Sequence, residues 1–189
     1  MKGRLGVLSR PVSHTPVNAR ASQGNVGENS IIYTGGAVGA SDSKGRFVLP
    51  LEMRKALRVS SNGENKIYLS IDPDCRFVIG YGRSHMAWLE QQICEKERNA
   101  LEKGLEYDGF AERELLFSGV EEVNFDDGGR FSLPADVKKL LNLGDALVVA
   151  GIGRQINFWD PAAFLASDGR NRLLRARVEE FMAEKGKGK

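Results

Sequence analysis

Two arginines, Arg46 and Arg130, are well suited by type and context to contact an anion. Each closes a short segment of the same form, Asp42-Ser-Lys-Gly-Arg46 in one place and Asp126-Asp-Gly-Gly-Arg130 in the other. A guanidinium group donates two parallel hydrogen bonds, which suit phosphate oxygens or the major-groove edge of guanine. The same arginines could instead form ion pairs with Asp42 and Asp126 inside each segment and so stabilise the turn. The spacing leaves both interpretations open.

The two segments belong to an internal repeat, in which Arg46 of the first copy corresponds to Arg130 of the second. Residues 42–57 and 126–141 are identical at eight of 16 positions, including the Asp, Gly, Arg, Phe, Leu and Pro of the motif. Chance gives about one identity over such a window, so duplication is indicated. One copy alone would leave sheet edges unpaired, and two copies can close onto each other about a pseudo-two-fold axis. This structural need explains the duplication but not the paired arginines.

Each copy is predicted to form a strand, a short helix and two more strands. Gly45 and Gly129 permit the positive φ of a tight turn, after which Arg-Phe-x-Leu continues as a strand. Pro50 and Pro134 are expected at the first position of a helix, where a missing N–H does no harm. The later strands are expected at residues 66–72, 76–81, 146–150 and 155–159.

Helical spacing divides the side chains of these two short helices between a buried and a solvated face. The residues expected in the core are Met53, Ala56, Leu57, Val137, Leu140 and Leu141. The residues expected to face water are Arg54, Lys55, Lys138 and Lys139.

Other helices are predicted between and after the two copies. One spans residues 84–103, with Ser84 as its cap and Gly104 as its end, and another spans 110–117 before a strand at 120–125. A last helix is expected over residues 169–185, with one apolar stripe. Its basic side chains are expected to be solvated, with a direct DNA contact as the alternative. These basic residues are Arg170, Arg172, Arg175 and Arg177.

Residues 1–30 are predicted to be a disordered leader, because no apolar periodicity runs through them. Their basic, acid-poor composition superficially resembles an organelle transit peptide. An over-extended start or an added leader is the alternative. This segment is therefore left out of the predicted fold.

Composition excludes several classes of protein. No apolar run approaches the roughly 20 residues of a membrane span, and no Cys-x-x-Cys pair or phosphate-binding glycine loop is present. Cys75 and Cys94 are the only cysteines, and His14 and His85 the only histidines. We therefore expect no enzyme, no metal site and no cofactor. Cys94 is expected to be half-buried and His85 to lie at the surface.

The distribution of charge constrains any contact with nucleic acid. The whole chain has a formal net charge of +2, but residues 42–160 carry 16 basic and 20 acidic side chains. A polyanion usually selects a basic surface. Binding by this region would therefore depend on localised basic loops, with acidic residues elsewhere limiting non-specific attraction.

The duplicated motif resembles that of the MraZ family. The resemblance rests on Asp42-Ser-Lys-Gly-Arg46 with the following Phe-Val-Leu-Pro, on its recurrence from Asp126 onward, and on the closing Ile156-Asn-Phe-Trp-Asp160. It covers roughly residues 31–164 and implies a mostly β α+β fold. In that fold two pseudo-symmetric AbrB-like βαββ repeats form one intertwined swapped-hairpin barrel, with added helices. The implied divisions are a first repeat at 31–82, connecting helices at 83–118, a second repeat at 119–165, and a C-terminal helix and basic tail at 166–189.

The resemblance also implies a function. Members of the family are bacterial transcriptional regulators, usually repressors, that bind double-stranded DNA at short direct repeats upstream of the division and cell-wall gene cluster. They do so as ring-shaped homo-oligomers in the cytoplasm, associated with the nucleoid and with no membrane partner.

The family's DNA-binding positions fall on five residues of this chain. They are Lys44, Arg46 and Arg130, with Arg54 and Lys138 as phosphate contacts. Gly128 departs from the pattern, because the first copy has Lys44 at this position, so the second turn would contact DNA more weakly or mainly support the fold. The alternative is a non-DNA assembly protein in which the duplicated motif builds an oligomer or docks another protein.

Overall fold

The computed structural model describes residues 31–168 and 171–187, so the predicted leader at residues 1–30 lies outside the described residues. The strands are β1 (Gly36–Ala40), β2 (Phe47–Val48), β3 (Lys66–Ile71), β4 (Val78–Tyr81), β5 (Glu121–Asn124), β6 (Arg130–Phe131), β7 (Ala146–Gly151) and β8 (Ile156–Trp159). The helices are α1 (Leu51–Ser60), α2 (Arg83–Lys103), α3 (Gly109–Phe117), α4 (Ala135–Leu140), α5 (Pro161–Ala166) and α6 (Arg172–Lys187). The fold is therefore mixed α and β, with antiparallel strand pairing.

The strand order is symmetric with respect to the two copies of the sequence. Six strands form one sheet in the order β1-β7-β8-β4-β3-β5, and β2 pairs with β6 separately. If each strand is exchanged for its counterpart, β1 for β5, β3 for β7 and β4 for β8, the order reverses and is otherwise unchanged. In the small sheet Phe47 lies opposite Phe131, which is its counterpart in the second copy.

The main core lies between the six-stranded sheet and a layer made of β2, β6, α1 and α4. Phe131 is at its centre, with its ring centroid 6.2 Å from that of Phe47 and 5.4 Å from that of Phe158. A second cluster covers the other face of the sheet, where Leu174 and Val178 of α6 pack with residues of β7 and α5. β7 is therefore buried on both of its faces.

The predictions for the two short helices are largely confirmed. Met53, Leu57 and Val137 are buried, while Ala56 and Leu141 are partly buried against the same core. The prediction for Leu140 is wrong, because its side chain is 60% exposed. α4 ends at this residue, and the chain turns so that the buried Leu143 fills the core instead.

The positions of the two prolines also differ from the prediction. Pro50 and Pro134 are the N-cap residues of α1 and α4 and precede the first helical residue. Their ψ angles of 144° and 143° are extended, so each proline ends the incoming strand segment. The start of each helix is therefore one residue later than predicted.

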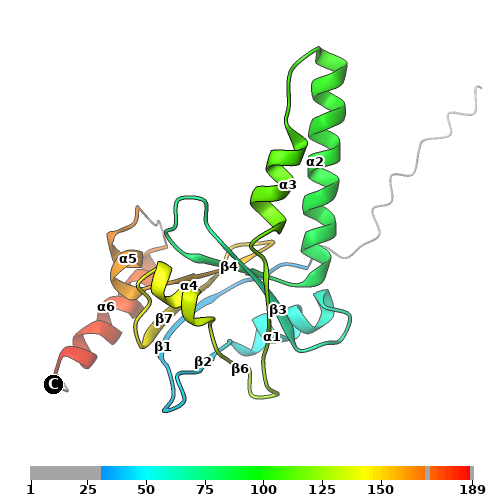
Figure 1. Cartoon of the computed structure of the whole chain (residues 1–189). Coiled ribbons are helices and arrows are strands. Elements are labelled where there is room, and N and C mark those ends of the chain that lie inside the picture. Colours follow the sequence, from blue (N-terminus) through cyan, green and yellow to red (C-terminus); the bar gives the residue numbers. More distant parts are fainter. Residues whose placement is uncertain (1–30, 169–170, 188–189) are drawn as a thin grey trace, which may run out of the picture.

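α2 and α3 form a hairpin that extends away from the sheet (Figure 1). α2 begins after Gly82 without a side-chain cap, so the prediction that Ser84 caps it is wrong. Gly104 ends α2 with a φ of 62°, as predicted, and Asp108 caps α3 by accepting a hydrogen bond from the backbone of Ala111. The exposed Cys94 corrects the expectation of a half-buried side chain.

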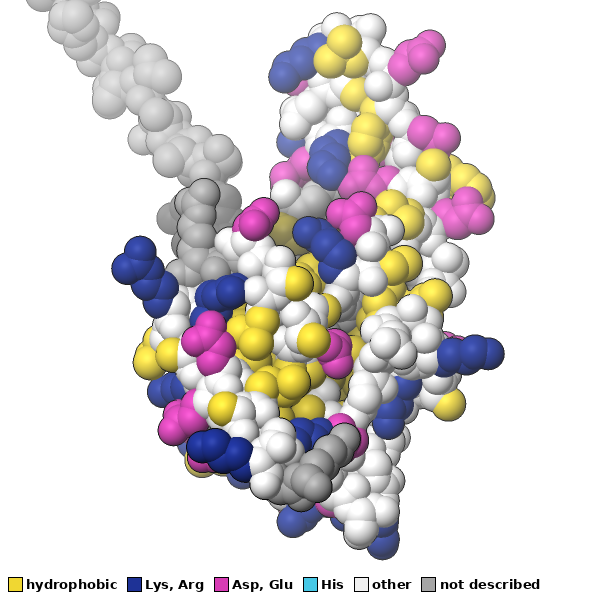
Figure 2. Space-filling model, turned by 90° about the vertical axis from the view of Figure 1, so that its left-hand side faces the viewer, with side chains coloured by type: hydrophobic (Ala, Val, Ile, Leu, Met, Phe, Trp, Pro, Cys, Tyr) yellow, Lys and Arg dark blue, Asp and Glu magenta, His cyan; other side chains and the backbone are white. Residues whose placement is uncertain are grey.

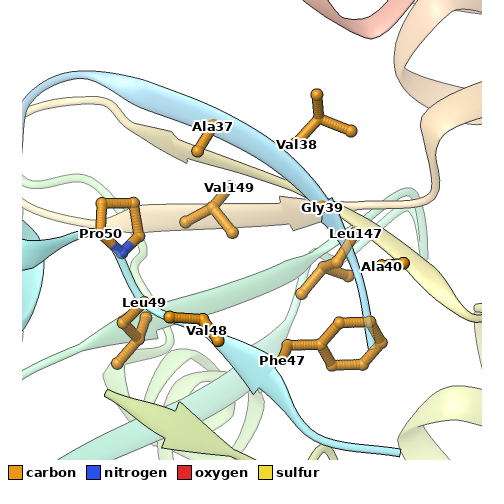
Figure 3. A pocket seen from close by; sticks show the side chains of 10 residues that line it. All are labelled: Ala37, Val38, Gly39, Ala40, Phe47, Val48, Leu49, Pro50, Leu147 and Val149. Carbon is orange, nitrogen blue, oxygen red and sulfur yellow. The ribbon is translucent and has the colours of Figure 1, made fainter. Parts of the chain in front are cut away.

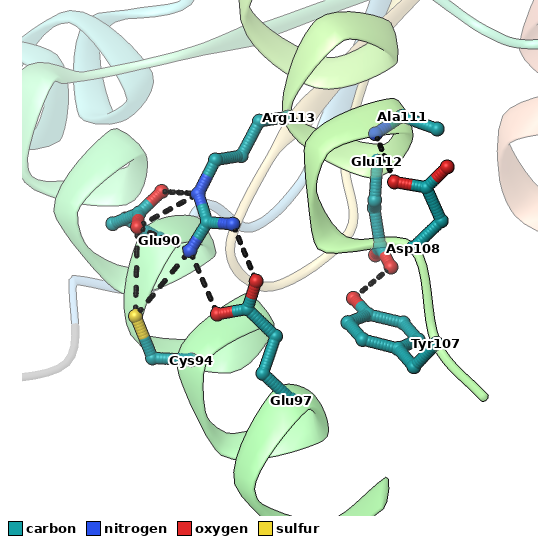
Figure 4. Close-up of polar contacts among 8 residues, drawn as sticks. All are labelled: Glu90, Cys94, Glu97, Tyr107, Asp108, Ala111, Glu112 and Arg113. Atoms are coloured by element: carbon teal, nitrogen blue, oxygen red, sulfur yellow. Dashed lines mark hydrogen bonds and ion pairs between the residues drawn. The ribbon is translucent and has the colours of Figure 1, made fainter. Parts of the chain in front are cut away.

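Arg113 joins the two helices of the hairpin. Its guanidinium group donates to Glu97 through Nη1 at 2.7 Å and to Glu90 through Nη2 at 2.8 Å (Figure 4). These hydrogen bonds hold the pKa of both carboxyl groups below their ordinary value. One α3 side chain thus contacts two residues of α2 that are about two helical turns apart.

Arg113→Ala is expected to release α3 from α2 while the sheet stays folded. Both glutamates would lose their shared partner, and like charges would then face each other on α2. Amide hydrogen exchange over residues 109–117 should become severalfold faster, with exchange in β7 unchanged. Arg98→Ala, at an exposed position of α2, is the control. Unchanged exchange in α3 would contradict this role of Arg113.

His85 is buried, which corrects the expectation of a surface residue. It is 8% exposed, and its ring lies between those of Tyr81 and Trp88, with centroids 4.7 and 5.2 Å away. Burial, assisted by the positive charge of Arg154, lowers the pKa of His85 to about 4. The helical pattern did not reveal this because His85 lies at the base of α2, where α2 meets the sheet.

His85 is expected to make stability fall in mild acid. Its ordinary pKa is 6.5 and its folded pKa is about 4, so between these values the unfolded chain binds a proton that the folded chain excludes. Stability should therefore decrease as pH falls through this window, by roughly 3 kcal/mol in all. Urea unfolding at pH 7, 5.5 and 4.5 would measure the loss. His85→Gln should show a smaller loss than the parent protein, and equal losses would contradict the assignment.

Of the two C-terminal helices, the sequence predicted α6 but not α5. α5 begins at Pro161, and the side chain of Asp160 caps it. In α6, Arg175 donates to the backbone oxygens of Leu165 and Ser167 at 2.7 and 3.0 Å, which closes the end of α5. This supports a packing role for Arg175, while Arg170 lies outside the described residues.

Candidate nucleic-acid interface

The first Asp-x-x-Gly-Arg turn is organised around Asp42. Its Oδ1 accepts the backbone N–H groups of Lys44 and Arg46 at 2.9 and 3.0 Å. Its Oδ2 accepts Nε and Nη2 of Arg46 at 2.9 and 2.7 Å. The Arg46 guanidinium lowers the pKa of Asp42 to about 2, and Gly45 has the predicted positive φ, 72°. The internal ion pair that the spacing allowed is therefore present.

This ion pair orients Arg46 without using all its donors. A guanidinium group has five N–H donors, and Asp42 receives one from Nε and one from Nη2. The side chain is 33% exposed. The remaining N–H groups, two on Nη1 and one on Nη2, can therefore donate to an acceptor outside the turn.

The second turn has the same backbone design. Asp126 accepts the backbone N–H of Arg130 at 2.8 Å, which is the main cause of its lowered pKa, and Gly129 has a φ of 80°. Oδ2 of Asp126 lies 3.6 Å from Nη1 of Arg130 and 3.8 Å from Nη1 of Arg46. One carboxylate thus lies between the two arginines that occupy equivalent positions in the repeat.

Pairing of β2 with β6 brings the two turns together. Val48 lies opposite Arg130, and Leu49 donates its N–H to the backbone oxygen of Gly129 at 2.8 Å. Both turns project at the bottom of the view in Figure 1, at the end of the molecule opposite the α2–α3 hairpin. The local turn geometry thus sets the position of each arginine, and the strand pairing sets their separation.

The two helix residues assigned as phosphate contacts are less solvated than expected. Arg54 is half-buried, and its Nη1 donates to the backbone oxygen of Asp127 at 3.0 Å. Its Nε is buried and has no hydrogen-bond partner within the described parts of the chain. Lys138 is also half-buried, with Nζ 5.5 Å from the ring centroid of Phe47. Lys55 and Lys139 are exposed, as predicted.

Two residues that sequence reasoning did not select, Arg58 and Asn65, also hold the second turn. Arg58 lies 3.3 Å from Oδ1 of Asp127 through Nη2 and donates to Asn65 through Nε at 2.8 Å. Asn65 in turn donates to the same Oδ1 at 3.1 Å. Arg58 follows Arg54 by one helical turn, which places both on one helix face. This spacing of two arginines is the sequence signal that could have identified Arg58.

Lys44 is exposed at the tip of the first turn, where the sequence predicted it. The corresponding position in the second turn, Gly128, is also exposed. The four positions of Lys44, Arg46, Arg130 and Arg54 are therefore gathered around the paired β2 and β6 strands. Lys138 joins this group through its contact with Phe47 of β2.

An apolar groove runs beside the first turn between β1 and β2 (Figure 3). It has a volume of about 270 Å³, and its lining includes Ala37, Gly39, Val48 and Leu147. The lining residues are all apolar or glycine, so the groove presents no side-chain hydrogen-bonding group to a ligand. Its chemistry suits an apolar side chain.

Charged side chains of both signs are interspersed on the face shown in Figure 2, around a hydrophobic central area. The described side chains on this face form no single large basic area (Figure 2). Within the described ranges, no group of three or more His, Cys, Asp and Glu side chains is placed to hold a metal ion. Nor does any helix described here have both the length and the apolar character needed to cross a membrane.

Comparison with known proteins gives a consistent result. Residues 116–173 match the family model described as "MraZ protein, putative antitoxin-like". A protein of Roseiflexus castenholzii named transcriptional regulator MraZ is 31% identical over 120 residues, which cover 64% of this chain and 75% of that protein. Proteins of the same name from Rhodospirillum rubrum and Caulobacter vibrioides are each 29% identical. Their alignments cover 68% and 70% of this chain, and 79% and 80% of the two relatives.

Proposed function

The chain belongs to the MraZ family, and from this membership we propose that it is a DNA-binding transcriptional regulator. It binds short direct repeats upstream of the division and cell-wall gene cluster, including its own operon, and acts as a repressor. The relatives named above are transcriptional regulators by name, which supports the general function. It acts in the cytoplasm, associated with the nucleoid.

The observation that carries the proposal is the pairing of β2 with β6. It places two exposed turns side by side, so that Arg46 and Arg130 both lie within 4 Å of Asp126. The ion pair with Asp42 fastens the first turn and still leaves three N–H groups of Arg46 for another acceptor. Two arginines held beside each other by strand pairing form a compact pair of donors for phosphate or guanine.

The proposed roles of the basic residues follow from their geometry. Arg46 is held by Asp42 with three N–H groups remaining, so it makes the directional contact. Lys44 is exposed and serves as a point charge for phosphate. Arg130 contributes a second, weaker contact, since Asp126 and Asp127 adjoin it. Arg54 and Lys138 contribute less to DNA binding, because both side chains are half-buried.

The symmetric strand order supports the proposed architecture. We propose two intertwined βαββ repeats at residues 31–82 and 119–165, joined by the connecting helices of 83–118 and followed by the C-terminal helix and basic tail of 166–189. Several chains form a ring that presents its paired turns to successive DNA repeats. Linking weak sites in this way raises affinity through effective concentration, so a modest charge per subunit suffices.

DNA from the region upstream of the gene tests this function. Fluorescence anisotropy should show tighter binding to that DNA than to a shuffled sequence of equal length and composition. Log affinity should fall with log salt at a slope of about −0.9 for each phosphate neutralised. Mass photometry of the same samples should show an oligomer joined to the DNA. An intact oligomer that binds neither DNA at low salt would instead support the non-DNA assembly role.

A further inference from the structure

The two turns carry opposite charge although they occupy equivalent positions. The first contains one carboxylate and two basic groups, from Asp42, Lys44 and Arg46. The second contains two carboxylates and one basic group, because Asp127 and Gly128 replace Ser43 and Lys44. The formal charge is therefore +1 for the first turn and −1 for the second. A strand pairing that is symmetric thus presents an electrostatically asymmetric surface.

The additional carboxylate, Asp127, is exposed but engaged. Its side chain is 94% exposed, while its Oδ1 accepts from Asn65 and lies 3.3 Å from Nη2 of Arg58. Its backbone oxygen accepts from Arg54. Three donor side chains from α1 and the following loop therefore converge on one residue of the second turn.

The donor set around Asp127 has the chemistry of a phosphate site. A guanidinium and a carboxamide N–H group converge on one anionic oxygen, as they would on a phosphate oxygen. The partners come from the α1 region of one copy and the acceptor from the turn of the other. A Cβ at Gly129 would lie 3.0 Å from Cδ of Arg54, so glycine at this position also allows the helix to approach the turn closely.

We propose that Asp127 is a specificity-determining residue that occupies Arg58 and Asn65 and keeps them from sequence-independent phosphate contacts. The inference rests on the proposed DNA-binding function. An exposed carboxylate beside the paired turns repels the backbone of any DNA, and its ion pair removes an additional basic donor from the surface. Sequence-independent attraction thus falls, while Lys44 and Arg46 of the first turn keep their donors.

Asp127→Ser tests the proposal because serine is the residue of the first turn at the same position. The variant should bind shuffled DNA about threefold to tenfold more tightly at low salt, since a nearby repulsive charge is lost and Arg58 is freed. The salt slope should become steeper by about 0.9 if one more phosphate is neutralised. Affinity for the upstream DNA should rise less, so discrimination between the two DNAs should fall.

Three further variants make the test specific. Asp127→Asn keeps the shape of the turn residue and should reproduce the gain even if the serine variant folds poorly. Arg58→Ala combined with Asp127→Ser should remove the increase in salt slope, because the freed donor is absent. Asp74→Asn removes an exposed carboxylate that is also paired with an arginine, Arg76 at 3.4 Å, and should change neither DNA affinity. A gain as large in Asp74→Asn would mean that net charge alone is responsible.

The outcomes separate this inference from the function on which it rests. If the parent protein binds no DNA, the proposed function fails. If the parent binds the upstream DNA while Asp127→Ser and Asp127→Asn bind shuffled DNA no more tightly, only the role of Asp127 is overturned. Weaker binding of both variants with unchanged unfolding would likewise overturn it, because Asp127 would then support the interface.

Discussion

Arg46→Ala is expected to reduce affinity for the upstream DNA by about a hundredfold or more. A hydrogen bond to a charged group contributes roughly 1.5–3 kcal/mol, and the loss recurs at every subunit engaged on the DNA. The substitution also leaves Asp42 without its guanidinium partner, so a negative charge faces the phosphate. Fluorescence anisotropy with the upstream DNA gives the measurement. Arg46→Lys should recover only part of the affinity, because it restores the charge without the fork of donors.

Arg76→Ala is a matched control for this substitution. Arg76 forms an ion pair of the same spacing with Asp72, through Nε at 2.7 Å and Nη2 at 3.0 Å, in the β3–β4 turn. Its loss should cost at least as much stability, because Asp72 is only 7% exposed and Asp42 is 31% exposed, but it should leave DNA affinity unchanged. If Arg46→Ala binds like the parent protein, Arg46 only fastens its turn. If Arg76→Ala loses affinity equally, the effect is one of general stability.

Phe131→Ala is expected to cause a large loss of stability. Phe131 is 1% exposed and contacts the rings of both Phe47 and Phe158, so alanine would leave a cavity at the junction of the two sheets. Truncation of a buried phenylalanine costs about 3–5 kcal/mol. For a chain of this size the melting temperature should fall by roughly 10 °C. Thermal unfolding followed by circular dichroism would measure the change.

Two comparisons test whether the cavity is the cause. Phe131→Leu keeps most of the volume and should lose less stability than Phe131→Ala. Phe110→Ala removes a ring that is 77% exposed on α3 and should change stability by no more than about 0.5 kcal/mol. A loss for Phe131→Ala no larger than that for Phe110→Ala would contradict the central position of Phe131 in the core.

Local signals predicted much of the chain correctly. Gly45 and Gly129 have positive φ, and Gly104 ends α2, because these conformations depend on a few adjacent residues. Met53, Leu57 and Val137 are buried, since helical spacing defines one face even in a short helix. The turns, the inward face of α1 and the buried position of Val137 in α4 were therefore predictable from sequence.

Features that depend on packing between distant segments were not predictable in the same way. The sequence does not show that Asp126 lies between Arg46 and Arg130, because this arrangement follows from the register of β2 with β6. His85 is buried by the aromatic residues around it, and Leu140 is exposed because α4 ends there. The internal ion pair of Arg46 was one of two possibilities that the spacing allowed, and only the position of the side chain showed that it forms.

The pairing of β1 with β7 has a consequence for the order of folding during synthesis. Gly36 lies opposite Ala150, so the first strand finds its place in the sheet only after most of the chain has been made. Contacts between residues so far apart in sequence slow folding and leave strand edges open in the meantime. On the ribosome, the β3–β4 hairpin can form early, whereas β1 must wait for the segment that completes its partner strand.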